Sequence, residues 1–234
     1  LGDRKFRNWK NYGSEMMTIV EALRDSCDTY FYRGAYNVGI DIMAPVLRRY
    51  GFGVKTGVDL PNEYIGIVPD AQWKKMRLNQ PWYQGDTINT SIGQGSFLAT
   101  PMQVARDTAI FAMGHDVTPH LIGSINGVPQ EWHARDILSQ KEKSALKYIR
   151  EGMHAVANIP GGTGFRVLSP SKVTIAAKSG TAQVVGISQE DKERIKEADM
   201  EYYERSHAWM TGYAPYENPR YIVTVLVEHG ASGG

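Results

Sequence analysis

The stretch Val173-Thr-Ile-Ala-Ala-Lys-Ser-Gly-Thr-Ala-Gln-Val-Val185 is the part of this chain that most clearly indicates its fold. Its apolar and β-branched residues predict strands at 173–177 and 181–185, with Lys-Ser-Gly between them. Runs of the same kind predict two more strands, at 208–213 and 221–227. Because these strands follow one another in the last third of the chain, we expect them to form an antiparallel sheet.

Helical patterns fill much of the chain before these strands. Apolar residues recur there at helical spacing, with cap and stop residues around them. Helices followed by an antiparallel sheet indicate an α+β domain. The expected helices are one that Ser14 caps and that carries Met17, Val20 and Leu23, one over 28–38, one that Asp41 caps and Gly51 stops, one from Thr100-Pro101 to Gly114, and one after the Ser139-x-x-Glu142 capping box.

Two segments fit neither pattern. Residues 51–99 hold many Gly, Pro and Asn residues and predict long ordered loops with short elements. Residues 189–205, which lie between predicted strands, are crowded with charge and predict an exposed, partly helical insertion.

Composition excludes several classes of protein. The chain has 234 residues and a net charge of +1, so no strong field favours nucleic acid as a partner. No apolar run approaches the roughly 18 residues that a membrane span needs. The single cysteine, Cys27, rules out a disulfide framework and is interpreted as a core residue. The chain starts without Met and stops just after a strand-like run, so we expect both ends to be cut.

The deciding strand also carries candidate site residues. A substrate carboxylate needs a cation and hydroxyl donors, which Lys178, Ser179 and Thr181 would supply together. Gly180 leaves room for a substrate backbone, and the backbone N–H of Thr181 could face an oxyanion. The same pattern at Lys55-Thr56-Gly57 lies in a turn-rich loop, and we interpret that copy as structural.

Ser26-Cys27-Asp28 is the second candidate motif. It falls at a helix junction, where Asp28 could simply cap the next helix. Penicillin-binding proteins and β-lactamases, however, combine Ser-x-x-Lys, Ser-x-Asn and Lys-Thr-Gly to carry out acyl transfer through a serine. We therefore hypothesise that Ser26, Asp28 and Lys178 form a catalytic group.

A nucleophile is the missing part of this set. Ser-x-x-Lys occurs at Ser144–Lys147 and at Ser169–Lys172, where about 0.7 matches are expected by chance. Ser144 is expected on the exposed side of a helix. Pro170 argues against the helix start that would aim Ser169 and its lysine at one spot. We interpret both matches as coincidences and expect the nucleophile to lie outside this chain.

Over essentially its whole length, the sequence resembles the class B penicillin-binding proteins of the elongation type. Several segments carry the resemblance, and their order along the chain makes it specific. They are Gly2-Asp-Arg-Lys-Phe-Arg-Asn-Trp-Lys, Ser26-Cys-Asp-Thr-Tyr-Phe-Tyr, Thr56-Gly-Val-Asp-Leu-Pro-Asn-Glu63, Trp73-Lys, Pro81-Trp-Tyr-Gln-Gly-Asp-Thr87, Ile92-Gly-Gln-Gly95, Thr100-Pro-Met-Gln103, Gly162-Thr-Gly164, Ala177-Lys-Ser-Gly-Thr-Ala-Gln183 and the last strand to Glu228-His-Gly230.

The resemblance implies a penicillin-binding, β-lactamase-like transpeptidase fold with helices flanking an antiparallel sheet. It implies a peptidoglycan D,D-transpeptidase, in which a serine attacks the D-Ala-D-Ala bond of one stem peptide and an amine from a neighbouring strand resolves the acyl-enzyme. Ser26 would relay a proton, and Asp28 would be the third residue of its motif. Lys178, Ser179 and Thr181 would hold the substrate carboxylate, and the Thr181 amide would form half of the oxyanion hole.

The resemblance also sets the expected boundaries and partners. In the family, Ser-x-x-Lys lies upstream of Ser-x-Asp, so residues 1–234 would be part of one transpeptidase domain that is incomplete at both ends and inactive alone. Expected partners are stem peptides ending in D-Ala-D-Ala, β-lactams and other proteins of the elongation machinery. The parent protein would be anchored in the bacterial inner membrane, with this domain in the periplasm.

Two alternatives and one departure remain. A serine β-lactamase or β-lactam sensor is disfavoured by Pro81–Gln103 and Gly162–Gly164, which resemble class B enzymes. A non-catalytic module that has lost its serine is the other alternative. The resemblance extends to relatives with His and Asp near the start as a metal cluster with the cysteine, but this chain has Asn8 and Ser14 in that region. We expect no zinc and no other cofactor.

Overall fold

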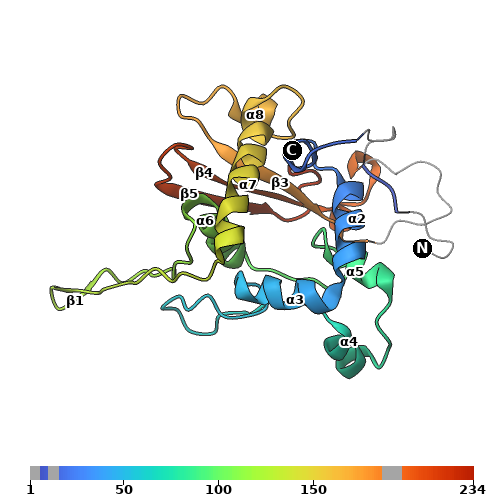
Figure 1. Cartoon of the computed structure of the whole chain (residues 1–234), viewed down its shortest axis with the longest axis horizontal. Coiled ribbons are helices and arrows are strands. Elements are labelled where there is room, and N and C mark those ends of the chain that lie inside the picture. Colours follow the sequence, from blue (N-terminus) through green and yellow to red (C-terminus); the bar gives the residue numbers. More distant parts are fainter. Residues whose placement is uncertain (1–5, 10–15, 186–196) are drawn as a thin grey trace.

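The computed structural model describes residues 6–9, 16–185 and 197–234, and it shows helices followed by an antiparallel sheet (Figure 1). The predicted α+β class is confirmed. The elements are α1 (Ile19–Arg24), α2 (Asp28–Val38), α3 (Ile40–Arg49), α4 (Ala71–Leu78), α5 (Gln84–Thr90), α6 (Pro101–Met113), β1 (Ser124–Ile125), β2 (Val128–Pro129), α7 (Gln140–Asn158), α8 (Phe165–Leu168), β3 (Ala176–Ala182), the 3-10 turns η1 (Glu197–Asp199) and η2 (Tyr202–Glu204), β4 (His207–Ala214) and β5 (Tyr221–Val227).

Strands β3, β4 and β5 form the sheet in that order, so β4 lies in the middle and β3 lies at an edge. The strands predicted at 173–177 and 181–185 merge into one continuous strand, β3, which pairs with β4 along its whole length. The expectation that Lys178, Ser179 and Thr181 lie on one strand is confirmed. The hydroxyl of Thr211 in β4 lies 2.7 Å from those of Thr224 in β5 and Thr108 in α6. This polar column ties the sheet to the helix that covers it.

Helices α6 and α7 cover one face of the sheet. Helix α7 packs against β3, and α6 packs against β4 and β5. Ala112, Met153, Ala176 and Tyr213 meet there in a buried cluster. Alternate residues of β5 are exposed, as expected for a strand with one covered face. The exposed set is Tyr221, Val223, Val225 and Val227.

Helix α1 approaches α7 closely at a glycine. A Cβ at Gly152 would come within 2.5 Å of Leu23 Cδ1, so a larger residue there would push α1 away. The predicted N-cap of α1 is wrong. Thr18 caps this helix and forms a capping box with Glu21, whereas Ser14 lies outside the described residues.

The other helix boundaries follow the sequence with one correction. Helix α3 begins one residue before Asp41, because Gly39, with φ +78°, ends α2 and starts α3. Asp41 lies in the first turn and is not the predicted cap. The capping boxes of Thr100 and Ser139 are confirmed. The two short helices α4 and α5 break up 51–99 as expected, and residues 186–196 of the predicted insertion lie outside the described part.

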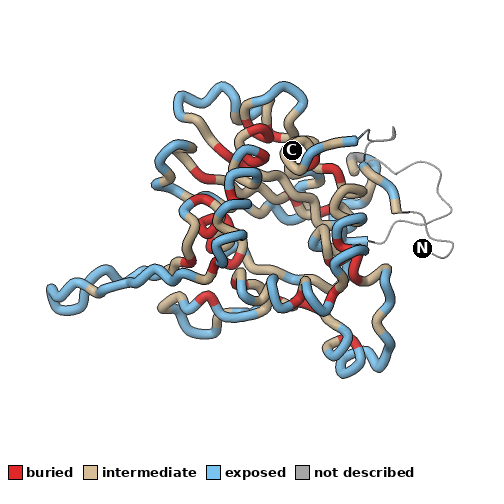
Figure 2. The backbone as a smooth tube through the Cα atoms, in the orientation of Figure 1, coloured by how far each residue is buried: buried red, intermediate tan, exposed pale blue. Residues whose placement is uncertain are grey.

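A long arm that contains β1 and β2 projects from the body of the domain (Figure 1) and is exposed along most of its length (Figure 2). Its base is held by Asp116, which is fully buried. Asp116 accepts hydrogen bonds from Arg106 at 2.6 and 2.7 Å and from Arg135 at 2.6 Å. Burial would raise the pKa of Asp116, but the two arginines hold it below its ordinary value.

We predict that Asp116→Ala destabilises the protein by roughly 3–5 kcal/mol, because it leaves the buried guanidinium of Arg106 unpaired. Chemical denaturation measures this change. The matched control is Asp136→Ala, which removes an exposed ion pair with Lys143 and should leave the unfolding midpoint almost unchanged. Equal effects of the two substitutions would contradict the structural role assigned to Asp116.

Candidate active site

The turn between α1 and α2 meets strand β3 at a side-chain contact. Lys178 Nζ donates a hydrogen bond of 2.9 Å to Ser26 Oγ, although the two residues are 152 positions apart in sequence. Lys178 Nζ also donates to the carbonyl of Ser179 at 2.8 Å. Two motifs singled out from the sequence therefore lie together.

The backbone of the turn aims Ser26 at the lysine. Ser26 has φ +52°, in the left-handed region that residues other than glycine adopt rarely and that often marks a functional constraint. The turn closes with a 2.9 Å hydrogen bond from the Cys27 N–H to the Ala22 carbonyl, and Trp9 Nε1 donates to the Ser26 carbonyl at 3.0 Å. Cys27 is buried, which confirms its interpretation as a core residue.

Asp28 is the first residue of α2 and not its cap. Cys27 occupies the N-cap position, so the capping explanation for Asp28 is wrong. The Asp28 N–H instead donates to Asn8 Oδ1 at 3.2 Å. The carboxylate of Asp28 acts electrostatically on Lys178, and this places it with the other two residues of the predicted group.

Burial lowers the pKa of Lys178 to about 8, because the protein around the ammonium group disfavours the charged form. The negative charge of Asp28 opposes this and raises the pKa. Below pH 8 the protonated form of Lys178 therefore predominates, and the site presents a cation. Above that pH the ammonium loses its proton and the cation is lost.

The outer edge of β3 exposes backbone groups of alternate residues. The Ser179 carbonyl accepts from Lys178, and the Thr181 carbonyl accepts from Gln94 Nε2 at 2.9 Å. Both carbonyls therefore point away from β4. Since the N–H and C=O of one strand residue point to the same side, the Thr181 N–H also points off this edge. A carbonyl oxygen placed beside β3 could accept a hydrogen bond from it.

The hydroxyls of β3 are engaged by two segments that sequence reasoning did not assign to the site. Ser179 Oγ lies 2.7 Å from Thr163 Oγ1, and Thr181 Oγ1 accepts from the Gly233 N–H at 3.4 Å. Thr163, and Gln94 of the preceding paragraph, each belong to a segment that carries the family resemblance. That resemblance was the sequence signal that could have assigned them to the site. Gly180 lies against Trp209, where an added Cβ would be only 3.2 Å from the Trp209 Cβ.

The other copies of these motifs, which the sequence analysis set aside, make local contacts or are exposed. Thr56 is buried and its hydroxyl bonds to Glu63, so the copy at 55–57 serves to hold its loop. Ser144 is exposed and donates to the Gln140 carbonyl of its own helix. Ser169 is the exposed C-cap of α8.

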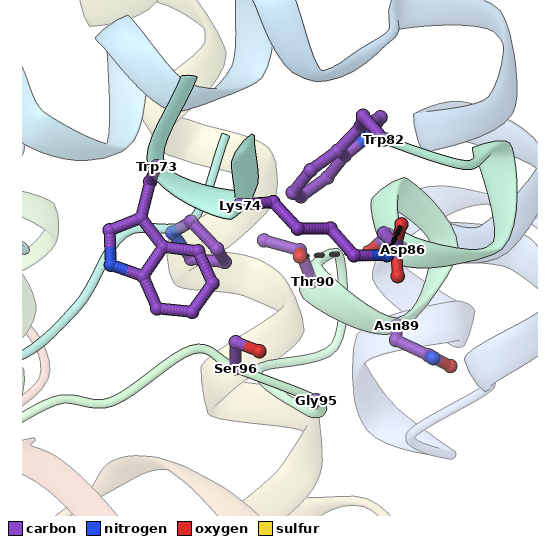
Figure 3. A pocket seen from close by; sticks show the side chains of 9 residues that line it. Trp73, Lys74, Trp82, Asp86, Asn89, Thr90, Gly95 and Ser96 are labelled. Carbon is purple, nitrogen blue, oxygen red and sulfur yellow. Dashed lines mark hydrogen bonds and ion pairs between the residues drawn. The ribbon is translucent and has the colours of Figure 1, made fainter. Parts of the chain in front are cut away.

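A small pocket between α4 and α5 lies beside the loop that carries Gln94 (Figure 3). Lys74 Nζ pairs with Asp86 Oδ2 at 2.6 Å inside it. Trp82 Nε1 donates to Thr87 Oγ1 at 2.8 Å. The Lys74–Asp86 pair links α4 to α5, and the Trp82–Thr87 bond ties α5 to the loop before it, so the contacts that line the pocket hold α5 in place.

Within residues 6–9, 16–185 and 197–234, no group of three or more His, Cys, Asp or Glu side chains is placed to hold a metal ion. In the same part of the chain, no helix is long and apolar enough to cross a bilayer.

The penicillin-binding protein transpeptidase domain matches the chain over residues 1–234. The chain belongs to this family. This membership agrees with the resemblance seen in the sequence.

Individual proteins that resemble the chain support the same family membership. The chain is 38% identical over 235 residues to "Peptidoglycan D,D-transpeptidase MrdA" of Haemophilus influenzae, covering 98% of this chain and 36% of that protein. It matches the penicillin-binding protein PBP2 of Helicobacter pylori in complex with MreC, with a TM-score of 0.87, 46% identity and coverage of 98% and 40%. Pseudomonas aeruginosa PBP2 in complex with WCK 5153 matches with a TM-score of 0.85, 36% identity and coverage of 99% and 49%. The chain thus spans less than half the length of these proteins.

We predict that Asp28→Asn lowers the pKa of Lys178 below about 8, because the negative charge that raises it is removed. NMR titration of isotopically labelled lysine measures this value, and a Lys178→Met variant assigns the signal. Asp41→Asn is the control, since Asp41 is exposed in the first turn of α3. An unchanged or raised pKa in Asp28→Asn would separate Asp28 from the site.

Proposed function

We propose that the protein containing this chain is a peptidoglycan D,D-transpeptidase that cross-links stem peptides during cell elongation, and that β-lactams acylate it. The observation that carries the proposal is the contact of Lys178 with Ser26 beside the outward N–H of Thr181. The MrdA and PBP2 relatives support the reaction and its role in elongation.

The proposed reaction begins with a serine of an upstream Ser-x-x-Lys motif, outside this chain. Its oxygen attacks the carbonyl carbon of the D-Ala-D-Ala bond and gives its proton to the base of that motif. The oxyanion of the tetrahedral intermediate accepts a hydrogen bond from the Thr181 N–H. The C–N bond then breaks, and the departing D-Ala takes up a proton that Ser26 relays. An amine of a second stem peptide then attacks the acyl carbon, the C–O bond of the ester breaks, and a proton from the amine returns to the serine oxygen.

The terminal carboxylate of the donor peptide would bind beside β3. Protonated Lys178 supplies a positive charge, and the hydroxyls of Ser179 and Thr181 supply hydrogen-bond donors. The lowered pKa of Lys178 fits this role, because the ammonium is charged at neutral pH and sits close to deprotonation. Asp28 supports the charged form.

The setting of the protein belongs to the same proposal. H. pylori PBP2 is found in a complex with MreC, and this supports partners from the elongation machinery for the present protein. We infer an anchor in the inner membrane and a transpeptidase domain in the periplasm, by analogy with the longer relatives.

We predict that Lys178→Ala lowers the second-order rate of acylation by a fluorescent penicillin by about 10²–10³-fold in the full-length protein, because a charged donor of the site is lost. Lys55→Ala is the matched control, since it alters the loop copy of the same motif, and it should acylate at the wild-type rate. Lys178→Ala that acylates normally would remove Lys178 from the site.

The position of the nucleophile is tested by intact mass after penicillin treatment. We expect an adduct on a version of the protein extended upstream and none on the 234-residue chain. An adduct on the chain itself would show that Ser144, Ser169 or another serine within it is reactive, and the proposed site would be wrong.

A further inference from the structure

We propose that Gln94 is a positioning residue that sets the orientation of the Thr181 N–H and the point where a bound peptide must stop along β3. This inference rests on the proposed function and goes beyond it, since Gln94 lies on neither candidate motif. It starts from one contact pair at the outer edge of the strand.

The side-chain amide of Gln94 forms two hydrogen bonds with the backbone, one to β3 and one to the residue that follows β3. Gln94 Nε2 donates to the Thr181 carbonyl at 2.9 Å, and Gln94 Oε1 accepts from the Gln183 N–H at 3.3 Å. One residue of a parallel neighbouring strand would engage the same two groups, the carbonyl of one residue and the N–H two residues further on. The side chain of Gln94 therefore takes the place of a strand partner at this end of the edge.

This pairing divides the edge of β3 in two. From the Thr181 carbonyl onward the edge is occupied by Gln94. Before it, the Thr181 N–H faces outward beside the Ser179 carbonyl, to which Lys178 donates. A peptide that pairs with the edge can run up to Thr181 and no further. Its carbonyl at the end of the ladder is then the one that meets the Thr181 N–H.

The conformation of the loop projects Gln94 toward β3. Gly93 and Gly95 flank it with φ of +72° and +74°, values that L side chains rarely adopt. The Gln94 N–H donates to the Asn89 carbonyl at 3.0 Å, just before the end of α5. The loop thus continues directly from α5, and its position depends on that helix.

Helix α5 is itself held in place by contacts between the residues that line the pocket shown in Figure 3. The Lys74–Asp86 pair joins α5 to α4, and Lys74 is buried. Thr90 Oγ1 donates to the Asp86 carbonyl at 2.8 Å, within the helix. A chain of contacts therefore runs from the partly buried Lys74–Asp86 ion pair through α5 and Gln94 to the backbone of Thr181. Rigid support of this kind is what an oxyanion donor requires, because its benefit depends on orientation before the substrate arrives.

The test separates binding of a penicillin from its acylation step in the full-length protein. In Gln94→Met, which keeps the length of the side chain but makes neither hydrogen bond, we expect the acylation rate constant to fall by about 10–100-fold. The dissociation constant of the initial complex should change by less than about threefold, because the groups proposed to bind the carboxylate, Lys178 and the hydroxyls of Ser179 and Thr181, are left in place. Gln72→Met, an exposed glutamine in α4, is the control and should behave as wild type.

Gln94→Glu keeps the acceptor for the Gln183 N–H and loses the donor to Thr181. Its acylation rate relative to wild type should recover as the pH falls through the glutamate pKa of about 4–5, where the protonated carboxyl can donate again. This variant keeps the inference testable if Gln94→Met does not fold.

Three outcomes would overturn the inference. One is wild-type acylation by Gln94→Met, and another is a loss confined to the dissociation constant. The third is a Gln94→Glu ratio that stays flat with pH. If the wild-type protein forms no acyl-enzyme at all, the proposed function fails and this inference fails with it.

Discussion

In the part of the chain that the structure describes, strand β3 pairs with another strand on one side only, and several segments contact its other side. Its inner edge pairs with β4 along its full length, and one face is covered by α7. At the outer edge, carbonyl and amide groups of Ser179 and Thr181 point outward. Lys178 and Gln94 each donate a hydrogen bond to one of the outward carbonyls. The stretch between them keeps its hydrogen-bonding capacity for a ligand.

Packing far from this edge determines whether Lys178 can meet Ser26. Helix α1 must lie close to α7 for its C-terminal turn to reach β3, and Gly152 permits that approach. The Thr163 N–H donates to the Arg24 carbonyl at 3.3 Å, and Thr163 Oγ1 lies 2.7 Å from Ser179 Oγ. The segment after α7 therefore contacts both the turn and the strand. Helix α7 packs against both α1 and β3, and so it positions the two motifs relative to each other.

The sequence predicts the class of fold and the residues of the two motifs, because strand patterns and short motifs are local signals. The error at α1 was avoidable, since Thr18-x-x-Glu21 is a capping box as clear as the one at Ser139. The sequence places Lys178 on a strand correctly, but it divides the apolar runs on either side into two strands, whereas pairing with β4 makes one strand of residues 176–182. Gln94 could not be assigned a role, because its partner lies 87 residues away and its contact depends on the path of a glycine-rich loop. Thr163 lies only 16 residues from Ser179, but its contact also depends on the path of a glycine-rich segment.

The left-handed backbone at Ser26 narrows the choice of amino acid there more than the chemistry alone would. A relay needs a hydroxyl, and serine, threonine and tyrosine carry one. At φ +52° a β-branched residue is a steric outlier, so threonine is disfavoured although its hydroxyl is equivalent. Tyrosine would carry its oxygen several ångströms beyond the ammonium group that now lies 2.9 Å away. With Ser26 in the relay role proposed above, an exchange of serine for threonine would keep the functional group but strain the backbone of the turn that holds it.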